Sequence, residues 1–122
     1  MYEYKAELVR VIDGDTYVFD IDLGFGISMR NQHVRLYGVD TPEKFRGTPS
    51  ERNLGEKATE FVKQWFKIHC PNGECVIKTY KSLTRSGKES KSFDRWLAEV
   101  SNLSCTEFLA QSLRDSGHEK ES

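Results

Sequence analysis

Apolar and polar side chains alternate along much of the first forty residues, with the period of two that is typical of strands. Residues 4–12 are rich in Leu, Val and Ile, and the Asp13-Gly14 pair that follows is a common hairpin turn. A second alternating run ends at the Gly-Phe-Gly sequence at 24–26, and residues 28–38 form a third run. The pattern therefore predicts three consecutive strands. The apolar positions of the second strand are Tyr17, Phe19, Ile21 and Leu23.

A helical period replaces this alternation between about residues 50 and 68. Apolar residues recur there at the three- and four-residue spacing of one helix face, and Pro49-Ser50 is a suitable start because proline is favoured in the first turn. The pattern predicts a helix whose apolar stripe packs into the core. The stripe consists of Leu54, Ala58, Phe61, Val62, Trp65 and Phe66.

Two further strands are expected at 74–80 and 95–100, with a polar, basic loop between them. Ser104 and Glu107 have the spacing of a capping box, which predicts that a last short helix begins there. Gly117 is positioned to end that helix, because glycine is favoured just after the last helical residue.

The order of these elements indicates an α+β domain. Five short strands with a helix after the third are what an OB-fold five-stranded β-barrel with flanking helices requires. We expect a single domain over residues 1–115, followed by a polar tail at 116–122 that frays because nothing ties it down.

Composition narrows the class of protein without changing this fold. The 122 residues are enough for one domain with its own core, and the chain is 37% hydrophobic and 30% charged, as in soluble globular proteins. A net charge of −1 means that any attraction to nucleic acid must come from a local patch. No apolar run reaches the length of a membrane span, and the first ten residues lack the apolar core of a signal peptide. We expect a cytoplasmic monomer without membrane partners, or a secreted protein if the chain is a processed mature form.

The cysteines do not suggest a disulfide framework, because their number is odd. Cys70 and Cys75 flank a Pro-Asn-Gly turn and are near enough in sequence for a bridge or for half of a zinc site. A zinc site needs four ligands, and no second Cys/His pair stands at a suitable spacing. We interpret Cys70 and Cys75 as reduced thiols on either side of a turn.

Acidic residues gather at one predicted end of the barrel. If the second and third strands are joined by a loop centred near residue 27, antiparallel pairing places residue 15 beside residue 39. Carboxylates this close repel one another unless protons or a cation relieve them, and such oxygen ligands suit Ca²⁺ or Mg²⁺. Pro42 restricts the backbone of Thr41, whose carbonyl oxygen would be a further ligand. The acids are Asp13, Asp15, Asp40 and Glu43.

Arg35 lies in the strand that leads into these acids, and two interpretations of it are open. A guanidinium presents paired donors to two phosphate oxygens and keeps its charge at any relevant pH, which favours a phosphate-binding role. The other interpretation is a purely structural salt-bridge network in which Arg35 neutralises Asp40 or Glu43. The spacing alone does not separate the two interpretations.

Three linked motifs resemble those of the staphylococcal nuclease (thermonuclease) family. They are VIDGDT at 11–16, VRLYGVDTPE at 34–43 and DRWLAEV at 94–100. The resemblance runs from about residue 5 to residue 115 and implies an OB barrel with flanking helices, in agreement with the hydrophobic pattern. The chain resembles a short form of this family, without the C-terminal segment that carries two tyrosines beside the nucleotide.

The resemblance implies a metal site built from the first two motifs. Asp15 and Asp40 resemble the carboxylate ligands of one catalytic Ca²⁺, with Mg²⁺ the less favoured ion. The main-chain oxygen of Thr41 resembles the remaining protein ligand. Asp13 matches a nearby acid that does not itself bind the metal.

The resemblance also implies the catalytic groups. Glu43 matches the residue that orients the attacking water or takes its proton, and Arg35 and Arg95 match the two arginines that hold the scissile phosphate. Arg95 stands in an FDRW context rather than in the commoner YGR context of the family. A histidine base is not expected, because none of the histidines lies in these motifs; they are His33, His69 and His118.

The implied activity is that of a Ca²⁺-dependent phosphodiesterase, an endonuclease that cuts DNA and RNA with low sequence specificity and leaves 3′-phosphate ends. The alternative is a non-catalytic OB-fold module that binds nucleic acid or protein, although degenerate modules of that kind usually lack the acids and arginines found here. With the C-terminal tyrosines missing, we expect nucleic-acid contacts from a tyrosine and the basic loop after it. These residues are Tyr80, Lys81, Arg85, Lys88 and Lys91.

Overall fold

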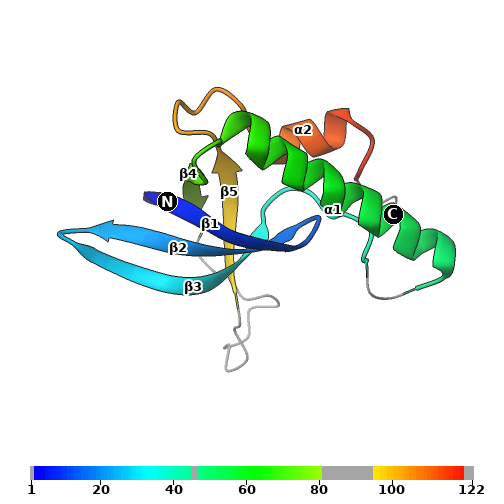
Figure 1. Ribbon diagram of the computed structural model, residues 1–122, viewed down its shortest axis with the longest axis horizontal. Helices are drawn as coiled ribbons and strands as arrows, with labels where there is room; N and C mark the ends of the chain where they lie inside the picture. Colours follow the sequence, from blue (N-terminus) through cyan, green and yellow to red (C-terminus); the bar gives the residue numbers. More distant parts are fainter. Residues whose placement is uncertain (1, 45–46, 81–94, 120–122) are drawn as a thin grey trace.

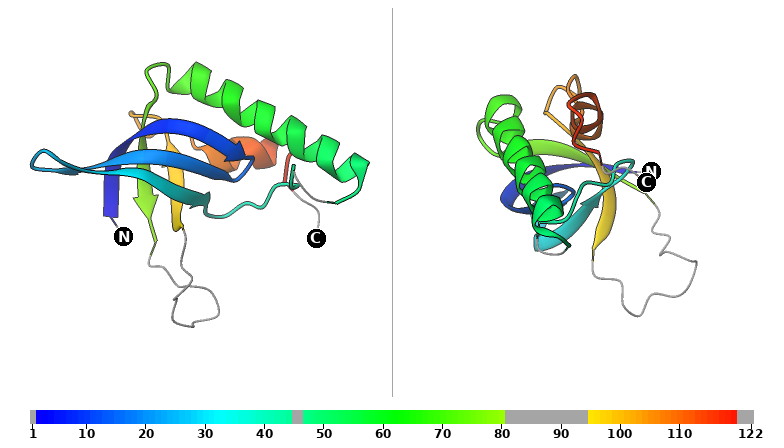
Figure 2. Two further views of the ribbon diagram at one scale, coloured as in Figure 1. Left: turned by 60° about the horizontal axis from the view of Figure 1, so that its bottom comes forward. Right: turned by 90° about the vertical axis from the view of Figure 1, so that its right-hand side faces the viewer.

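A computed structural model describes residues 2–44, 47–80 and 95–119, and these form a closed five-stranded barrel flanked by helices (Figures 1 and 2). The α+β OB-fold barrel expected from the sequence is confirmed. Neither helix within the described ranges is long and apolar enough to cross a membrane. The strands are β1 (Tyr2–Asp13), β2 (Thr16–Gly24), β3 (Ile27–Leu36), β4 (Glu74–Thr79) and β5 (Trp96–Ser101), and the helices are α1 (Pro49–His69) and α2 (Leu109–Asp115).

The barrel closes through strands that are distant in sequence. β1, β2 and β3 form an antiparallel meander, and β1 pairs on its other side with β4. β5 lies between β4 and β3, antiparallel to β4 and parallel to β3. The parallel pairing places Arg35 beside Leu97, so the end of β3 and the start of β5 share one region of the barrel.

The β2–β3 hairpin projects beyond the rest of the barrel (Figures 1 and 2). Gly24 pairs with Ile27, and the backbone angle φ is 55° at Phe25 and 74° at Gly26. Positive φ at both turn residues is the type I′ geometry that matches the twist of a two-residue hairpin. Phe25 is fully exposed and lies in the left-handed region that large side chains seldom adopt.

This turn changes the register expected from the sequence. With the turn at Phe25-Gly26 and two register shifts between the strands, Thr16 pairs with Arg35. The amide of Leu36 donates a hydrogen bond of 2.8 Å to the carbonyl of Asp15. The prediction that residue 15 lies beside residue 39 is therefore wrong, because the hairpin turns before residue 27.

The core fills the barrel and extends to the inner face of α1. Tyr17, Phe19 and Phe66 contact one another edge to face, with ring centroids 5.8 to 6.2 Å apart. The predicted helix stripe is buried except at Leu54, which is half exposed, and at Phe61, which is partly buried. Gly55 occupies the buried face in place of Leu54. The buried residues of α1 are Gly55, Ala58, Thr59, Val62, Trp65 and Phe66.

α1 begins with a capping box that directly precedes Pro49. The Thr48 hydroxyl accepts a hydrogen bond from the Glu51 amide (3.2 Å), and the Glu51 carboxylate accepts one from the Thr48 amide (2.8 Å). Two amides that have no partner within the helix are thereby satisfied. The predicted start near Pro49-Ser50 is confirmed, and Pro49 occupies the first helical position.

α2 begins later than the sequence predicted. Its N-cap is Phe108, which makes no side-chain capping bond. The Asn102 side chain accepts hydrogen bonds from the amides of Thr106 (2.9 Å) and Glu107 (3.0 Å), so Glu107 belongs to a turn rather than to a helix. The predicted Ser104–Glu107 capping box is therefore wrong. Gly117, with φ of 78°, follows the C-cap of the helix as predicted.

Cys70 and Cys75 are free, buried thiols that influence each other's ionisation. Interaction with the Cys75 thiol lowers the pKa of Cys70 although burial opposes the change, and interaction with Cys70 together with burial raises the pKa of Cys75. The amide of Gly73 donates to the carbonyl of Cys70 (2.8 Å) and closes the turn between them. The two thiols thus flank a tight turn between α1 and β4.

Candidate functional site

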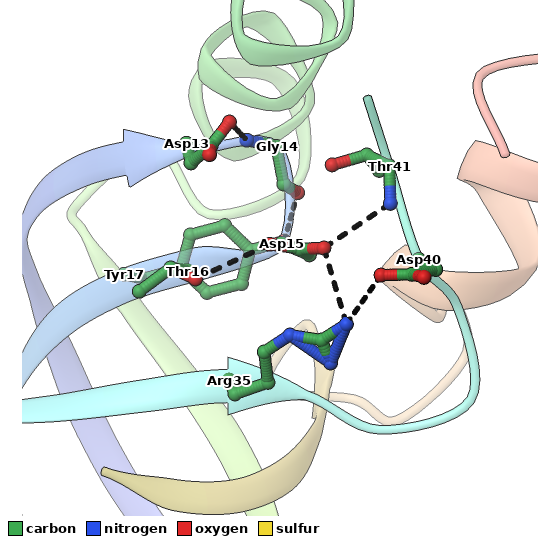
Figure 3. A network of polar contacts seen from close by, with 8 residues as sticks. All are labelled: Asp13, Gly14, Asp15, Thr16, Tyr17, Arg35, Asp40 and Thr41. Atoms are coloured by element: carbon green, nitrogen blue, oxygen red, sulfur yellow. Dashed lines mark hydrogen bonds and ion pairs between the residues drawn. The ribbon is translucent and has the colours of Figure 1, made fainter. Parts of the chain in front are cut away.

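Three segments of the chain meet where β1 passes into β2 (Figure 3). The turn between these strands carries Asp15, the end of β3 carries Arg35, and the loop after β3 carries Asp40 and Thr41. The structure therefore brings together the first two sequence motifs, although by a different register from the one expected.

Asp15 links the turn to the loop. The residue is only 7% exposed, and its Oδ2 atom accepts a hydrogen bond of 3.1 Å from the amide of Thr41. Its Oδ1 atom accepts a bond of 3.2 Å from the Thr16 hydroxyl. A buried carboxylate that accepts a backbone amide is held in one orientation, so Asp15 fixes the distance between the turn and the loop.

Arg35 lies between two carboxylates. Its Nη2 atom is 2.5 Å from Oδ1 of Asp40 and 3.4 Å from Oδ2 of Asp15 (Figure 3). Burial alone would lower the pKa of Arg35, but the hydrogen bond to Asp40 and the charges of both acids outweigh it, and the pKa is raised. The guanidinium thus relieves the repulsion between Asp15 and Asp40. The sequence analysis expected a cation or protons to do so.

The acids do not form one cluster, contrary to the expectation that all four surround a small volume. Asp13 turns back on its own strand, where Oδ1 accepts a hydrogen bond of 2.8 Å from the Gly14 amide (Figure 3). Burial raises the pKa of Asp13 against the lowering effect of this bond, and the charges of Asp15 and Glu43 raise it further. The pKa of Asp13 therefore depends on the charges of Asp15 and Glu43, although its hydrogen bond is made within the turn.

Gly14 allows the turn to touch the loop. A Cβ atom placed on Gly14 would lie 2.5 Å from Oγ1 and 2.9 Å from Cβ of Thr41, so no larger residue fits without moving the loop. The carbonyl of Gly14 also accepts a bond of 2.6 Å from the hydroxyl of buried Tyr17. The sequence analysis treated this glycine only as a turn residue, and its role in packing depends on a tertiary contact.

The close contact leaves the Thr41 hydroxyl without a hydrogen-bond partner among the described residues. The residue is 2% exposed, and its Oγ1 atom has no hydrogen-bond partner in the part of the chain that the structure describes. Figure 3 shows this hydroxyl directed toward the Asp13-Gly14 turn. A buried hydroxyl without a partner costs about 1–3 kcal/mol.

Thr41→Val should therefore raise the free energy of unfolding by about 1 kcal/mol, because valine has the same shape and no hydroxyl to satisfy. Urea denaturation in the presence of a chelator measures this change. Thr59→Val is the matched control, because the buried Thr59 hydroxyl donates a bond of 2.8 Å to the Gly55 carbonyl. A gain in stability at Thr59 equal to the gain at Thr41 would contradict the explanation.

Glu43 and Arg95 lie near this site on separate segments. Glu43 is exposed two residues beyond Thr41, and its charge reaches Asp13. Arg95 is exposed and directly precedes β5, the strand whose Leu97 pairs with Arg35. The predicted catalytic residues therefore come from neighbouring segments of the barrel end.

The expected nucleic-acid contacts are only partly within the described residues. Tyr80 stacks on Tyr37 with ring centroids 4.0 Å apart and an interplanar angle of 20°. The sequence analysis did not single out Tyr37, an exposed residue that directly follows β3. Lys81, Arg85, Lys88 and Lys91 lie outside the residues that the structure describes.

The three histidines take no part in the contacts described for the acids and Arg35 in this region. His69 packs against Trp65 and His118 against Phe61, with ring centroids 5.0 and 4.8 Å apart. His33 is exposed on β3 and pairs with Val18. The contacts of Asp15, Arg35 and Asp40 given above involve none of the three.

The donor atoms at this site suit a hard divalent cation. Oxygens of Asp15 and Asp40 both contact the same Arg35 nitrogen, so they are near enough to face one positive charge. Across residues 2–44, 47–80 and 95–119, no group of three Asp, Glu, His or Cys side chains has a metal-binding arrangement. A cation here would therefore rely on two carboxylates, the Thr41 carbonyl and water, all of them oxygen ligands of the kind Ca²⁺ prefers.

Comparison with known proteins gives two relevant matches, and no family model matches the chain. A thermonuclease of Staphylococcus hyicus is 36% identical over 62 residues, 51% of this chain and 33% of that protein. A thermonuclease of Staphylococcus intermedius is 40% identical over 55 residues, 45% of this chain and 29% of that protein. The matches span about half of this chain and a third or less of each thermonuclease. They confirm the resemblance to the staphylococcal nuclease family that the motifs indicated.

Proposed function

We propose that this protein is a metal-dependent nuclease that hydrolyses phosphodiester bonds in DNA and RNA with low sequence specificity. One observation carries the proposal: Arg35 Nη2 contacts both Asp40 Oδ1 (2.5 Å) and Asp15 Oδ2 (3.4 Å), beside Thr41. This arrangement puts a group that binds phosphate and groups that bind a cation within one site. The similarity to two thermonucleases supports the same activity.

One Ca²⁺ is the proposed metal, and Asp15, Asp40 and the Thr41 carbonyl would hold it. A cation bound there supplies positive charge that offsets the charge of the scissile phosphate. Arg35 bridges the same two carboxylates, so a cation bound there would compete with its guanidinium for them. A guanidinium displaced from the acids would be available to the phosphate.

The protein groups then act on the phosphate and on water. Arg35 and Arg95 bind the non-bridging oxygens and stabilise the charge that builds on them in the transition state. Glu43 accepts a proton from water as the water oxygen forms a bond to phosphorus. The bond from phosphorus to the 5′-oxygen breaks, and that oxygen takes a proton from solvent. The products are a 3′-phosphate and a 5′-hydroxyl, and a base positioned in this way contributes about 10²–10⁴ in rate.

The ion pairs of Arg35 also suit a second function, that of a non-catalytic OB-fold module that binds nucleic acid or protein. In that case the Arg35 bridge is a permanent structural feature, and the acids need no metal. The two functions differ in whether the chain cuts a phosphodiester bond.

Incubation of the protein with plasmid DNA, single-stranded DNA and RNA separates the two functions. We expect cleavage with Ca²⁺ and none with a chelator, and we expect a DNA polymerase to extend the products only after a phosphatase has removed their 3′-phosphates. Binding without cleavage in every divalent metal tested would favour the non-catalytic module. Cleavage that leaves extendable 3′-hydroxyl ends would contradict the proposed products.

A further inference from the structure

Gly55 is an unusual residue for its position in α1. It lies in the second turn of the helix and is buried, although glycine is the poorest helix former after proline. A buried helical position that is occupied by the least suitable small residue points to a neighbour that leaves no room for a side chain.

That neighbour is the peptide bond between Glu43 and Lys44. A Cβ atom placed on Gly55 would lie 2.6 Å from the Lys44 amide nitrogen and closer still to the carbonyl carbon and oxygen of Glu43. Non-bonded carbon atoms pack at about 3.5–4.0 Å, so even a methyl group overlaps this peptide. The overlap is with backbone, which cannot move aside by changing a rotamer.

The same loop is fixed at its other end by contacts already described. The Thr41 amide donates to Asp15 Oδ2 (3.1 Å), and the Thr41 side chain rests on Gly14. The loop is therefore held against the β1–β2 turn at Thr41 and against α1 at Glu43. Two contacts on either side of Pro42 leave the loop little freedom to move Glu43 relative to Asp15.

We propose that Gly55 is a positioning residue that sets where the Glu43 carboxylate stands relative to the scissile phosphate. The proposal rests on the proposed nuclease function, in which Glu43 takes the proton of the attacking water. Gly55 packs against the peptide bond between Glu43 and Lys44 and acts on the Glu43 side chain through this backbone. Because α1 is rigid and anchored in the core, it serves as a fixed surface for an otherwise exposed acid.

The test is Gly55→Ala in the full chain with Ca²⁺ and a single-stranded DNA substrate. We expect kcat to fall roughly 10- to 100-fold with little change in KM, because a displacement of about 1 Å at a reacting group has effects of that size. Circular dichroism and thermal melting should report an intact fold. Asn53→Ala is the matched control, because Asn53 is an exposed residue of the same helix and its replacement by alanine favours the helix in the same way.

A double-mutant cycle separates positioning from general damage. Once Glu43→Gln has removed the proton acceptor, adding Gly55→Ala should cost no further activity. An equal loss in both backgrounds, or near-parental cleavage by Gly55→Ala, would overturn the proposal.

The amide chemical shifts of Thr41, Glu43 and Lys44 provide a readout that does not depend on activity. These shifts should change in Gly55→Ala and remain at their parental values in Asn53→Ala. Unchanged shifts in Gly55→Ala would overturn the packing argument. A parent that cuts no nucleic acid in any divalent metal would instead overturn the nuclease function, and with it the catalytic meaning of Gly55.

Discussion

Arg35→Lys is expected to lower kcat for DNA cleavage by about two orders of magnitude or more, within the range known for arginine contacts in phosphoryl transfer. Lysine keeps the charge but loses the planar fork that holds two phosphate oxygens at once. The loss should appear in kcat rather than in DNA affinity, because the guanidinium contacts strengthen as charge builds in the transition state. Single-turnover kinetics and a binding titration with chelator measure the two effects separately.

Arg30→Lys is the matched control for this substitution. Arg30 is exposed on the same strand, β3, and lies closer to the hairpin turn than to the acids. Its replacement should leave the rate unchanged. Arg95→Lys should reduce kcat as strongly as Arg35→Lys, since both arginines are proposed to hold one phosphate. Near-parental cleavage by both Arg35→Lys and Arg95→Lys would refute the catalytic role and favour a salt-bridge role for Arg35.

Asp40→Asn should abolish the stimulation of cleavage by Ca²⁺, a loss of at least about 10²-fold, because one of the two proposed carboxylate ligands becomes neutral. The fold should survive. Asp40 is well exposed, and its ion pair with Arg35 is of the surface type that contributes about 0–1 kcal/mol. Cleavage rates as a function of Ca²⁺ concentration, together with urea denaturation, measure both expectations.

Asp22→Asn is the control for Asp40→Asn. Asp22 is exposed in the β2–β3 hairpin, and its Oδ1 accepts a bond of 2.8 Å from the Gly24 amide, which an asparagine oxygen also accepts. It should keep the parental response to Ca²⁺. If Asp40→Asn cleaves as fast as the parent at saturating Ca²⁺, Asp40 is not a metal ligand.

The hydrophobic pattern predicted the barrel because strand period and helix period are local properties of a sequence. It failed where the outcome depended on competition between local signals. Gly24 and Gly26 both permit a turn, and only the pairing of Gly24 with Ile27 selects the turn at Phe25-Gly26. Ser104 and Glu107 have the spacing of a capping box, but the Glu107 amide donates its hydrogen bond to the Asn102 side chain instead of to Ser104.

The candidate site was predictable in its residues and not in its contacts. The motifs named Asp15, Arg35 and Asp40, and these meet at the end of the barrel. The bridging position of Arg35 could not be derived, because it depends on side-chain geometry between segments. Gly55 carried a signal that the pattern analysis did not use, since an isolated glycine in a helical run often marks a close contact.

The parallel pairing of β3 with β5 has a consequence for synthesis of the chain. Arg35 precedes α1 and β4 in the sequence, whereas Arg95 follows them. A chain leaving the ribosome has the acids and Arg35 early, but Arg95 joins them only after β5 has emerged and inserted between β3 and β4. The two arginines that are proposed to hold one phosphate therefore come together only after β5 has folded against β3, and a nascent chain that lacks β5 has only the first of them in place.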